Sequence, residues 1–309
     1  NVFPEEDENY DTVISKLNIM KEMINEENVN HKLIENSQNK TVISNYKRED
    51  FCKLVDKAKE YITSGDIFQV VISQRFKVKN SIDPFEIYRK LRRSNPSPYM
   101  FYIDFKDFKL AGASPESLVK VKGNIVMTNP IAGTKPRGKN AKEDVLLKGE
   151  LLKDEKELAE HLMLVDLGRN DIGKISEFGS VKLDKFMEVE AFSHVMHICS
   201  KVSGTLKSEL NCFDALKSCL PVGTVSGAPK IRAIEIIDEL ENTRRGIYSG
   251  AIGYFSYGGD MDTCIAIRTI VFKDDFAYVQ GGAGIVYDSV PKTEYTETMN
   301  KTMALMEVL

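Results

Sequence analysis

The sequence predicts a largely antiparallel α+β fold, and three observations lead to it. Apolar segments typical of strands occur in runs joined by short turns, whereas a doubly wound parallel sheet alternates strands with helices. The 309 residues are 42% hydrophobic and 28% charged, a composition that suits a large buried core. We see no low-complexity tract and no repeat with a fixed period. We therefore expect one main domain over residues 41–309, preceded by a helix and linker remnant over residues 1–40.

The first 40 residues are polar and rich in asparagine. Val13, Leu17 and Met20 recur at helical spacing, so we expect a helix over residues 10–24 and a loop over residues 31–39. The segment shows no core of its own. We interpret it as a connection from a region that precedes it in a longer chain.

The expected helices combine an amphipathic pattern with a start or stop signal. Residues 47–63 repeat apolar side chains at helical spacing and end at a Ser-Gly-Asp stop. Pro84 and Pro291 suit the first turn of a helix, because the N–H that proline lacks would be unpaired there. The expected helices cover residues 47–63, 83–94, 140–167 (with a polar stop at 168–173), 211–220, 230–241 and the segment that begins at Pro291.

The expected strands are apolar or alternating runs bounded by turn residues. Residues 67–78 alternate, with Gln69 and Gln74 inside the apolar run. The Asn-Pro-Ser-Pro sequence at 95–98 forces an extended or turning chain, and glycine- and proline-marked loops are expected at 131–138 and 221–230. The expected strands cover residues 67–78, 99–105, 109–113, 118–121, 124–129, 181–189, 192–202, 247–257, 262–273 and 276–280.

Composition and charge argue against two classes of partner. The net charge is −4, whereas a nucleic-acid-binding protein normally carries a basic face. No apolar run approaches the roughly 18 residues that a membrane helix needs, so no membrane partner is expected. The five cysteines form no Cys-x-x-Cys pair, which favours free thiols and a cytoplasmic location.

Two glutamate pairs share a spacing that places both carboxylates of each pair on one helix face. They are Glu157 with Glu160, and Glu294 with Glu297. Such a pair is common on a solvated helix face, but the second pair follows a glycine-rich strand end. Oxygen ligands of this kind suit Mg²⁺, which takes one or two carboxylates and completes its shell with water and substrate oxygens. The pattern predicts a magnesium site that binds an anionic substrate.

Several side chains able to bind a carboxylate or transfer a proton lie in the C-terminal half of the chain. Arg268 stands in an apolar strand, where its planar guanidinium suits bidentate carboxylate binding, and Tyr248 offers a phenol donor. His194 and His197 are three residues apart on a strand and therefore face opposite sides. This spacing argues against a paired zinc site and leaves one of the two as a candidate acid or base.

Seven motifs, taken together and in order, resemble the chorismate-utilising enzymes, and within them the anthranilate synthase large subunits. The resemblance covers residues 41–309. The motifs are GDIFQVVISQRF (65–76), NPSPYMFY (95–102), PIAGTKPRG (130–138), ELAEHLMLVDLGRND (157–171), SHVMHICSKVSG (193–204), VGTVSGAPK (222–230) and CIAIRT with QGGAGIVYDSVPKTEYTET near the C-terminus.

The resemblance implies a fold and a metal site. The family fold is a single domain with two antiparallel sheets packed between helices. Mg²⁺ would bridge the ring carboxylate of chorismate to Glu160 and Glu297, with Glu157 and Glu294 as outer members of the acidic cluster.

The resemblance also implies which residues act on chorismate. Thr224 would lie near the ring, and His197 would serve the pyruvate-elimination step. The substrate-binding residues would be Gly133, Thr134, Tyr248, Arg268, Gly282, Ala283 and Gly284.

Two positions bear on which reaction is implied. Relatives that make isochorismate or salicylate carry a water-activating lysine where this chain has Gln69. Relatives that make aminodeoxychorismate carry an adduct-forming lysine where this chain has Ala132. Both departures favour attack by ammonia at C2 followed by loss of pyruvate. The alternatives are an enzyme that stops at aminodeoxyisochorismate, an aminodeoxychorismate synthase, and a chorismate-binding fragment without activity.

The resemblance implies partners beyond the substrate. Ammonia would come from a glutamine amidotransferase subunit, because no glutamine-hydrolysing triad is visible here. Pro98, Tyr99 and Met100 resemble part of a tryptophan inhibitor pocket. The Leu-Leu-Glu-Ser motif that completes this pocket in the family is absent from the sequence, so feedback by tryptophan is expected for a longer chain.

Overall fold

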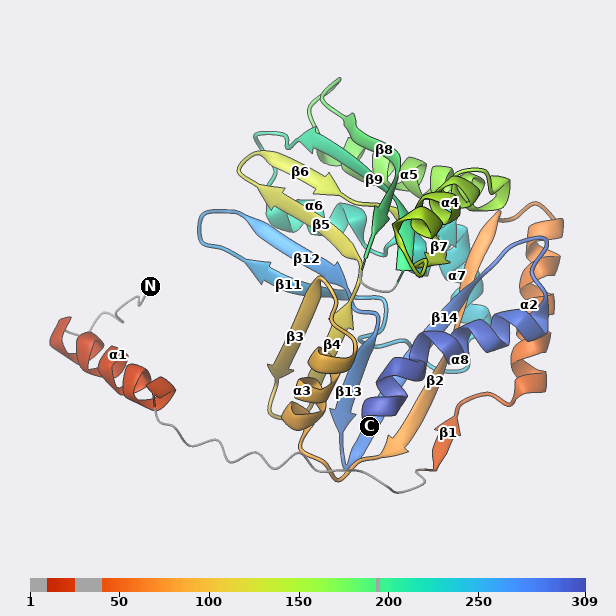
Figure 1. Cartoon of the computed structure of the whole chain (residues 1–309). Helices are drawn as coiled ribbons and strands as arrows, with labels where there is room; N and C mark the ends of the chain where they lie inside the picture. Colours follow the sequence, from red (N-terminus) through yellow and green to blue (C-terminus); the bar gives the residue numbers. More distant parts are fainter. Residues whose placement is uncertain (1–9, 26–40, 193–194) are drawn as a thin grey trace. The chain divides into compact units, whose positions relative to one another are not determined.

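The computed structural model describes residues 10–25, 41–192 and 195–309 and divides the chain into two units, Asn1–Asn39 and Lys40–Leu309 (Figure 1). In the first unit, α1 (Tyr10–Asn25) forms as its apolar spacing predicts, and none of its residues is buried. The remaining elements belong to the second unit. No helix in the described ranges is long and apolar enough to span a membrane.

The first sheet of the second unit is built around two long central strands, β2 and β14. Its strand order is β1 (Val42–Ser44), β2 (Gln69–Lys79), β14 (Phe276–Ile285), β13 (Thr269–Lys273), β4 (Lys109–Ser114) and β3 (Tyr99–Asp104), and β10 (Gly227–Ala228) also pairs with β2. Gly281 to Ile285 pair with β2 along their whole length, so the glycine run lies inside the strand. The expected end of this strand at residue 280 was therefore too early.

The second sheet carries the middle of the chain. Its order is β11 (Ala251–Phe255), β12 (Met261–Ile265), β5 (Ser117–Lys122), β6 (Ile125–Thr128), β9 (Val195–Thr205) and β7 (Ile131–Pro136), and β8 (Lys182–Ala191) also pairs with β9. The pairings in both sheets are antiparallel. The predicted α+β class with two antiparallel sheets is confirmed.

Helices bury the apolar side chains of both sheets. Those that pack with the first sheet are α2 (Arg48–Thr63), α3 (Pro84–Ser94), α7 (Lys230–Leu240) and α8 (Pro291–Val308), and those with the second are α4 (Ala141–Leu151), α5 (Glu155–Ile175) and α6 (Cys212–Cys219). Pro84 and Pro291 occupy first turns, as predicted.

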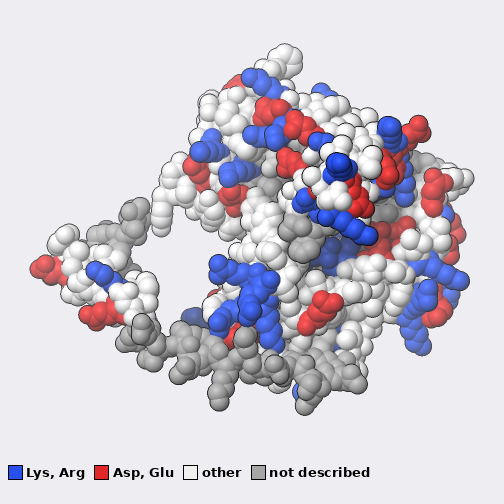
Figure 2. Space-filling model, viewed as in Figure 1, with Lys and Arg blue, Asp and Glu red and all other residues white. Residues whose placement is uncertain are grey.

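Acidic and basic side chains are interspersed over the viewed surface (Figure 2).

The expected loop at 131–138 is mostly a strand, because β7 pairs with β9. A register shift between Ala132 and Thr134 allows this pairing, and Gly133 adopts a φ of 69° at that shift. Glycine reaches this region without the steric cost that a side chain would add. The glycine that marks a loop in the sequence therefore marks a bulge in the structure.

The single helix expected over 140–167 is two helices, α4 and α5. Asp154 separates them, and its side chain accepts a hydrogen bond from the Glu157 amide as the N-cap of α5. α5 then continues through the expected polar stop to Ile175, because Ile172 and Ile175 are buried in the core of the second sheet. Tertiary burial thus overrides the local glycine signal.

The strand expected over 262–273 is broken at its middle. β12 belongs to the second sheet and β13 to the first, and the chain passes between them at residues 266–268. Arg268 adopts a φ of 50°, a conformation that interrupts an extended strand. Arg268 therefore stands at a junction between the sheets.

Candidate active site

The four glutamates of the predicted acidic cluster lie in the first two turns of α5 and α8. Burial raises the pKa of Glu157, and the neighbouring carboxylates of Glu160 and Glu297 raise that pKa further. Burial also raises the pKa of Glu294, again with a contribution from Glu297. Glu157 thus lies near the carboxylates of Glu160 and Glu297, and Glu294 lies near that of Glu297; repulsion among such carboxylates favours a bound cation.

The chemistry of this donor set is oxygen only. Within the described ranges, no three or more His, Cys, Asp or Glu side chains are placed to hold a metal by themselves. Two carboxylates completed by water and substrate oxygens are an arrangement typical of Mg²⁺. The cluster thus fits a metal that binds together with an anionic ligand.

Gln69 begins β2 beside this cluster. Its Nε2 donates to Glu160 Oε1 at 3.4 Å, while its buried Oε1 has no hydrogen-bond partner in the described chain. Gly284 leaves the space that the amide occupies, since a Cβ there would lie 2.4 Å from Gln69 Nε2. A buried polar atom without a partner is costly, so this acceptor is available to a ligand group or an ordered water.

His197 lies on β9 against the β7 bulge. Its Nδ1 is 2.9 Å from the Gly133 carbonyl oxygen and 3.2 Å from Thr134 Oγ1. A donor to a carbonyl fixes the proton on Nδ1 and leaves Nε2 as the acceptor. Burial lowers the pKa of His197, which keeps the ring neutral near pH 7. A Cβ on Gly133 would lie 3.2 Å from Glu157 Oε2, so the bulge also approaches the acidic cluster.

The open edge of β14 presents backbone amides to the site. β13 pairs with β14 only from Phe276 to Val279, because the chain leaves for the second sheet at Arg268. The amides of Ser73 and Val71, opposite Gly282 and Gly284, donate to Glu241 and Ser226. Gly282–Ser73 and Gly284–Val71 are therefore non-hydrogen-bonded pairs of the antiparallel ladder. The residues of a non-hydrogen-bonded pair direct their N–H and C=O groups away from the partner strand.

Gly282 and Gly284 therefore direct their amides to the side that β13 vacates. A Cβ on Gly282 would lie 2.8 Å from Tyr248 Oη, so that phenol reaches the same edge. The side chain of Ala283 instead packs in the hydrophobic core with Phe51 and Ile72. Ala283 can contribute only its backbone.

Two cations neighbour this edge. Lys301 Nζ donates to the Gly282 carbonyl at 3.1 Å and pairs with Glu297 Oε1 at 2.6 Å. The Arg268 guanidinium donates to the carbonyl of Lys301. Burial raises the pKa of the Tyr248 phenol to about 12, and the Arg245 and Arg268 guanidinium groups oppose this rise. Sequence reasoning missed Lys301, although its position four residues after Glu297 on a helix was the available signal.

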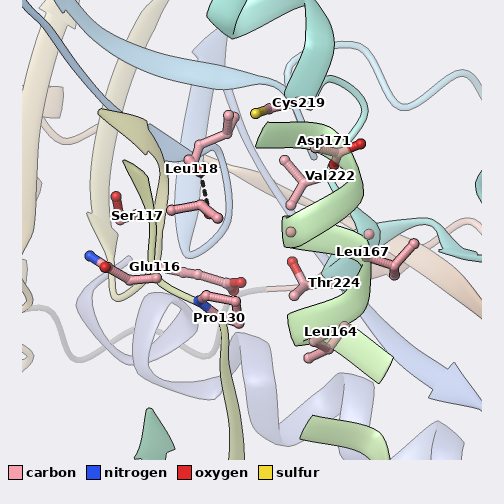
Figure 3. A pocket seen from close by; sticks show the side chains of 14 residues that line it. Glu116, Ser117, Leu118, Pro130, Leu164, Leu167, Asp171, Cys219, Val222 and Thr224 are labelled. Atoms are coloured by element: carbon pink, nitrogen blue, oxygen red, sulfur yellow. Dashed lines mark hydrogen bonds between the residues drawn. The ribbon is translucent and has the colours of Figure 1, made fainter. Parts of the chain in front are cut away.

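Thr224 and Glu116 face each other across a small cavity (Figure 3). The buried Thr224 Oγ1 makes no well-formed hydrogen bond in the described chain, but its hydroxyl lies near enough to the Glu116 carboxyl to favour the ionised form of that acid. Burial raises the pKa of Glu116 to about 7, although the Thr224 hydroxyl and the Lys301 ammonium both favour its ionised form. The cavity of ≈ 30 Å³ is lined by Glu116, Ser117, Leu118, Thr128, Asn129, Pro130, Leu164, Leu167, Gly168, Asp171, Cys219, Val222, Gly223 and Thr224.

Glu116 is the principal residue that the sequence analysis missed. It lies between β4 and β5, where the Ser-Pro-Glu-Ser sequence resembles an ordinary polar turn. Only the folding of the two sheets around it shields this carboxyl from much of the water, and Glu116 remains partly exposed. A carboxylic acid whose pKa is close to 7 is partly protonated at neutral pH and can act as a proton donor.

The predicted inhibitor-pocket residues stand apart from the acidic cluster. Tyr99 Oη donates to Asp262 Oδ1 at 3.1 Å, Met100 packs with the core beneath α3, and Pro98 is exposed. They belong to β3 or precede it, and β4, β13 and β14 separate β3 from β2 in the sheet. His194 lies outside the described residues.

Comparisons with known proteins identify the family of the chain. Residues 3–307 match the sequence model of the chorismate binding enzyme family. The chain is 58% identical to anthranilate synthase component 1 of Acetivibrio thermocellus over 87% of this chain and 54% of that one, and 55% identical to that of Aquifex aeolicus over 86% and 54%. The crystal structure of anthranilate synthase component I from Streptococcus pneumoniae superposes with a TM-score of 0.90 at 49% identity, covering 97% of this chain and 67% of that one.

The chain spans about half the length of the curated relatives that it matches. The match to the family covers nearly all of the chain, and it includes both glutamate pairs and the β14 edge. The chain therefore belongs to the chorismate binding enzyme family.

Proposed function

We propose that the chain is the catalytic part of an anthranilate synthase large subunit, which converts chorismate and ammonia to anthranilate and pyruvate. The observation that carries the proposal is the acidic cluster beside Gln69, with the Gln69 amide 3.4 Å from Glu160. The two relatives named above, and the similar crystal structure, are anthranilate synthases by name.

Mg²⁺ is part of the proposal, and Glu160 and Glu297 would hold it. When bound, the ion polarises the ring carboxylate and stabilises negative charge as the C4 hydroxyl leaves. Gly282 and Gly284 amides, Tyr248 and Arg268 would orient the enolpyruvyl carboxylate at the open edge of β14.

Three side chains supply proton transfer in this proposal. Glu116 is protonated in part near pH 7 and would donate its proton to the departing C4 hydroxyl, with Thr224 beside it to orient the ring. His197 would then accept the C2 proton at Nε2 as pyruvate leaves, because its Nδ1 is committed to the Gly133 carbonyl.

The residue at position 69 favours ammonia over water as the nucleophile. A glutamine amide cannot act as a base toward water, whereas ammonia attacks without one. The β7 bulge has Ala132 rather than a lysine, which excludes a covalent adduct through that side chain. His197, already hydrogen-bonded to the bulge, favours elimination over release of the aminated intermediate.

The proposal includes partners of the longer protein. A glutamine amidotransferase subunit would supply ammonia, and tryptophan would inhibit through a pocket that includes Pro98, Tyr99 and Met100. A cytoplasmic location agrees with the five free cysteines.

The test is an assay of the chain with chorismate, Mg²⁺ and ammonium, with anthranilate followed by fluorescence. The proposal predicts Mg²⁺-dependent anthranilate and equimolar pyruvate. Accumulation of aminodeoxyisochorismate without pyruvate would instead support the enzyme that stops before elimination. Chorismate binding by calorimetry without any product would support a binding fragment.

A further inference from the structure

A buried ion pair precedes Tyr248 and is not used by the proposed chemistry. Arg245 Nη2 donates to Glu241 Oε1 at 2.6 Å, and Arg245 Nε donates to Glu241 Oε2 at 3.0 Å. The two side chains are only 14% and 4% exposed. Burying two charges costs free energy that geometry and further hydrogen bonds must offset. The other groups that Arg245 and Glu241 contact should therefore explain why this ion pair is buried here.

The remaining donors of Arg245 reach two backbone carbonyls. Nη1 donates to Val225 O and Nη2 to Val71 O, each at 2.6 Å. Val225 follows Thr224 in a short 3₁₀ helix, η1 (Gly223–Val225). Val71 lies on β2 opposite Gly284. One guanidinium thus links the segment that carries Thr224 to the strand that supports the glycine edge.

Glu241 extends the same network along β2. Its Oε1 accepts hydrogen bonds from the amide and the hydroxyl of Ser73, each at 2.8 Å. Ser73 lies opposite Gly282. Because the Ser73 amide donates to Glu241 and not to β14, Gly282 turns its own amide toward the open edge.

Arg245 also contacts the segment that ends at Tyr248. Its carbonyl accepts a hydrogen bond from the Tyr248 amide at 3.2 Å, and its guanidinium carbon lies 5.6 Å from the centroid of the Tyr248 ring. That distance is within the range of a cation–π contact. The Tyr248 hydroxyl in turn approaches Gly282.

We propose that Arg245, held by Glu241, is a positioning residue that fixes the carboxylate-binding wall formed by Tyr248, Gly282 and Gly284. The inference rests on the proposed function, because that function gives the wall its ligand. Arg245 touches no substrate and acts through the groups that it holds. The planar guanidinium of arginine is required at this position. A lysine ammonium cannot reach a carboxylate and two carbonyls on different segments at once.

The first experiment compares Arg245→Lys with Arg244→Lys, whose side chain is exposed in the same turn. Chorismate binding is measured by calorimetry with Mg²⁺, and KM and kcat are measured with ammonium. We expect Arg245→Lys to raise Kd and KM by about tenfold to a hundredfold, with a smaller change in kcat. Arg244→Lys should match the wild type. Wild-type Kd and KM in Arg245→Lys would overturn the inference.

The second experiment asks whether Arg245 acts through Tyr248. If it does, Arg245→Lys combined with Tyr248→Phe should weaken binding by clearly less than the product of the two single effects. Fully multiplicative effects would contradict the inference. Should Arg245→Lys fail to fold, Ser73→Ala removes one hydroxyl from Glu241 and should raise KM in the same direction by a few-fold. An unchanged KM in Ser73→Ala would then contradict the inference.

The two proposals fail in different ways. A wild-type chain that binds chorismate but makes no anthranilate contradicts the proposed function, and the Kd comparison still tests Arg245. A wild-type chain that makes anthranilate while Arg245→Lys keeps its Kd and KM contradicts only the positioning role.

Discussion

At the scale of single residues, the site depends on groups whose protonation is set by the fold. Burial shifts the pKa values of Glu116 and His197 in opposite directions. It raises the pKa of the Glu116 carboxyl to about 7 and lowers the pKa of the His197 imidazole. An acid and a base are thereby both available near pH 7. Neither shift can be deduced from the local sequence, because each arises from side chains that are distant along the chain.

The pKa of Glu116 predicts how the rate depends on pH. The protonated form is the proton donor, so kcat should fall as the pH rises through about 7. The neutral form of His197 is the base, so kcat should also fall on the acid side, below the ordinary imidazole range. A pH profile of kcat with saturating ammonia checks both limbs.

Glu116→Gln removes the proton donor while keeping the shape of the side chain. We expect kcat to fall by about a hundredfold or more, with little change in chorismate Kd. The alkaline limb of the pH profile should disappear with it. Glu177→Gln, a change at an exposed glutamate, is the control. A Glu116→Gln variant with wild-type kcat would show that another group donates the proton.

At the scale of elements, sequence periodicity located the segments but not their partners. The helices at α2, α3 and α8 follow directly from apolar spacing and from the positions of proline. β7 was expected to be a loop because Gly133, Pro136 and Gly138 mark turns in isolation. Pairing with β9 makes it a strand, and that pairing is not encoded in the spacing of β7.

The β7 bulge gives a prediction about one glycine. Gly133 and Gly123 both have positive φ, at 69° and 59°, so alanine should cost about 1–2 kcal/mol of unfolding free energy at either position. A Cβ at Gly133 would in addition lie 3.1 Å from Ile198 and 3.2 Å from Glu157, whereas nothing lies within 4 Å at Gly123. We expect Gly133→Ala to lose activity by about tenfold or more.

Gly123→Ala is the matched control for this prediction, because it carries the strain without the contacts. Denaturant titration measures the stability of both variants, and the ammonium assay measures their activity. Equal activity in the two variants would show that the space around Gly133 is not needed for catalysis.

One buried hydrogen bond joins α5 and β9, the elements that carry Glu160 and His197. His161, next to Glu160 on α5, lies 2.6 Å from Ser200 Oγ on β9, and that hydroxyl also accepts from the Met187 amide at 2.9 Å. Ser200→Ala leaves the buried His161 Nε2 and the partly buried Met187 amide without this partner. We expect a loss of about 1–3 kcal/mol of unfolding free energy.

The control is Ser208→Ala, at an exposed serine, which should change stability by less than about 0.5 kcal/mol. Thermal unfolding of the two variants measures the difference. If Ser200→Ala is as stable as Ser208→Ala, the contact between α5 and β9 depends on apolar packing and not on this hydrogen bond.

At the scale of the whole molecule, the candidate site lies where the chain passes between the sheets. Glu116 is in the connection from β4 to β5, and Arg268 is in the connection from β12 to β13. Glu160 belongs to a helix of the second sheet and Glu297 to a helix of the first. The repeated glutamate spacing marked the two glutamate pairs in the sequence, but an apolar run that crosses from one sheet to the other looks continuous there. The crossing points, and Glu116 with them, follow only from the tertiary fold.

This placement predicts that Mg²⁺ with chorismate stabilises the molecule as a unit, because the ion would join helices from both sheets. A ligand that binds only the folded state adds about 2.7 kcal/mol at a hundred times its Kd. Thermal unfolding with and without Mg²⁺ and chorismate should show this increase in the wild type. Glu297→Gln should abolish the Mg²⁺-dependent part, whereas Glu307→Gln, at an exposed position on the same helix, should retain it.

The same stabilisation should weaken as the pH falls. Burial and neighbouring carboxylates raise the pKa values of Glu157 and Glu294, so protons compete with the cation in the acid range. Protonation removes the negative charge that attracts Mg²⁺, and the Mg²⁺-dependent increase in Tm should shrink between neutral and acid pH. If Glu297→Gln shows the same Mg²⁺-dependent increase in Tm as the wild type, the ion binds elsewhere. An effect that does not change with pH would mean that these carboxylates do not contribute to its binding.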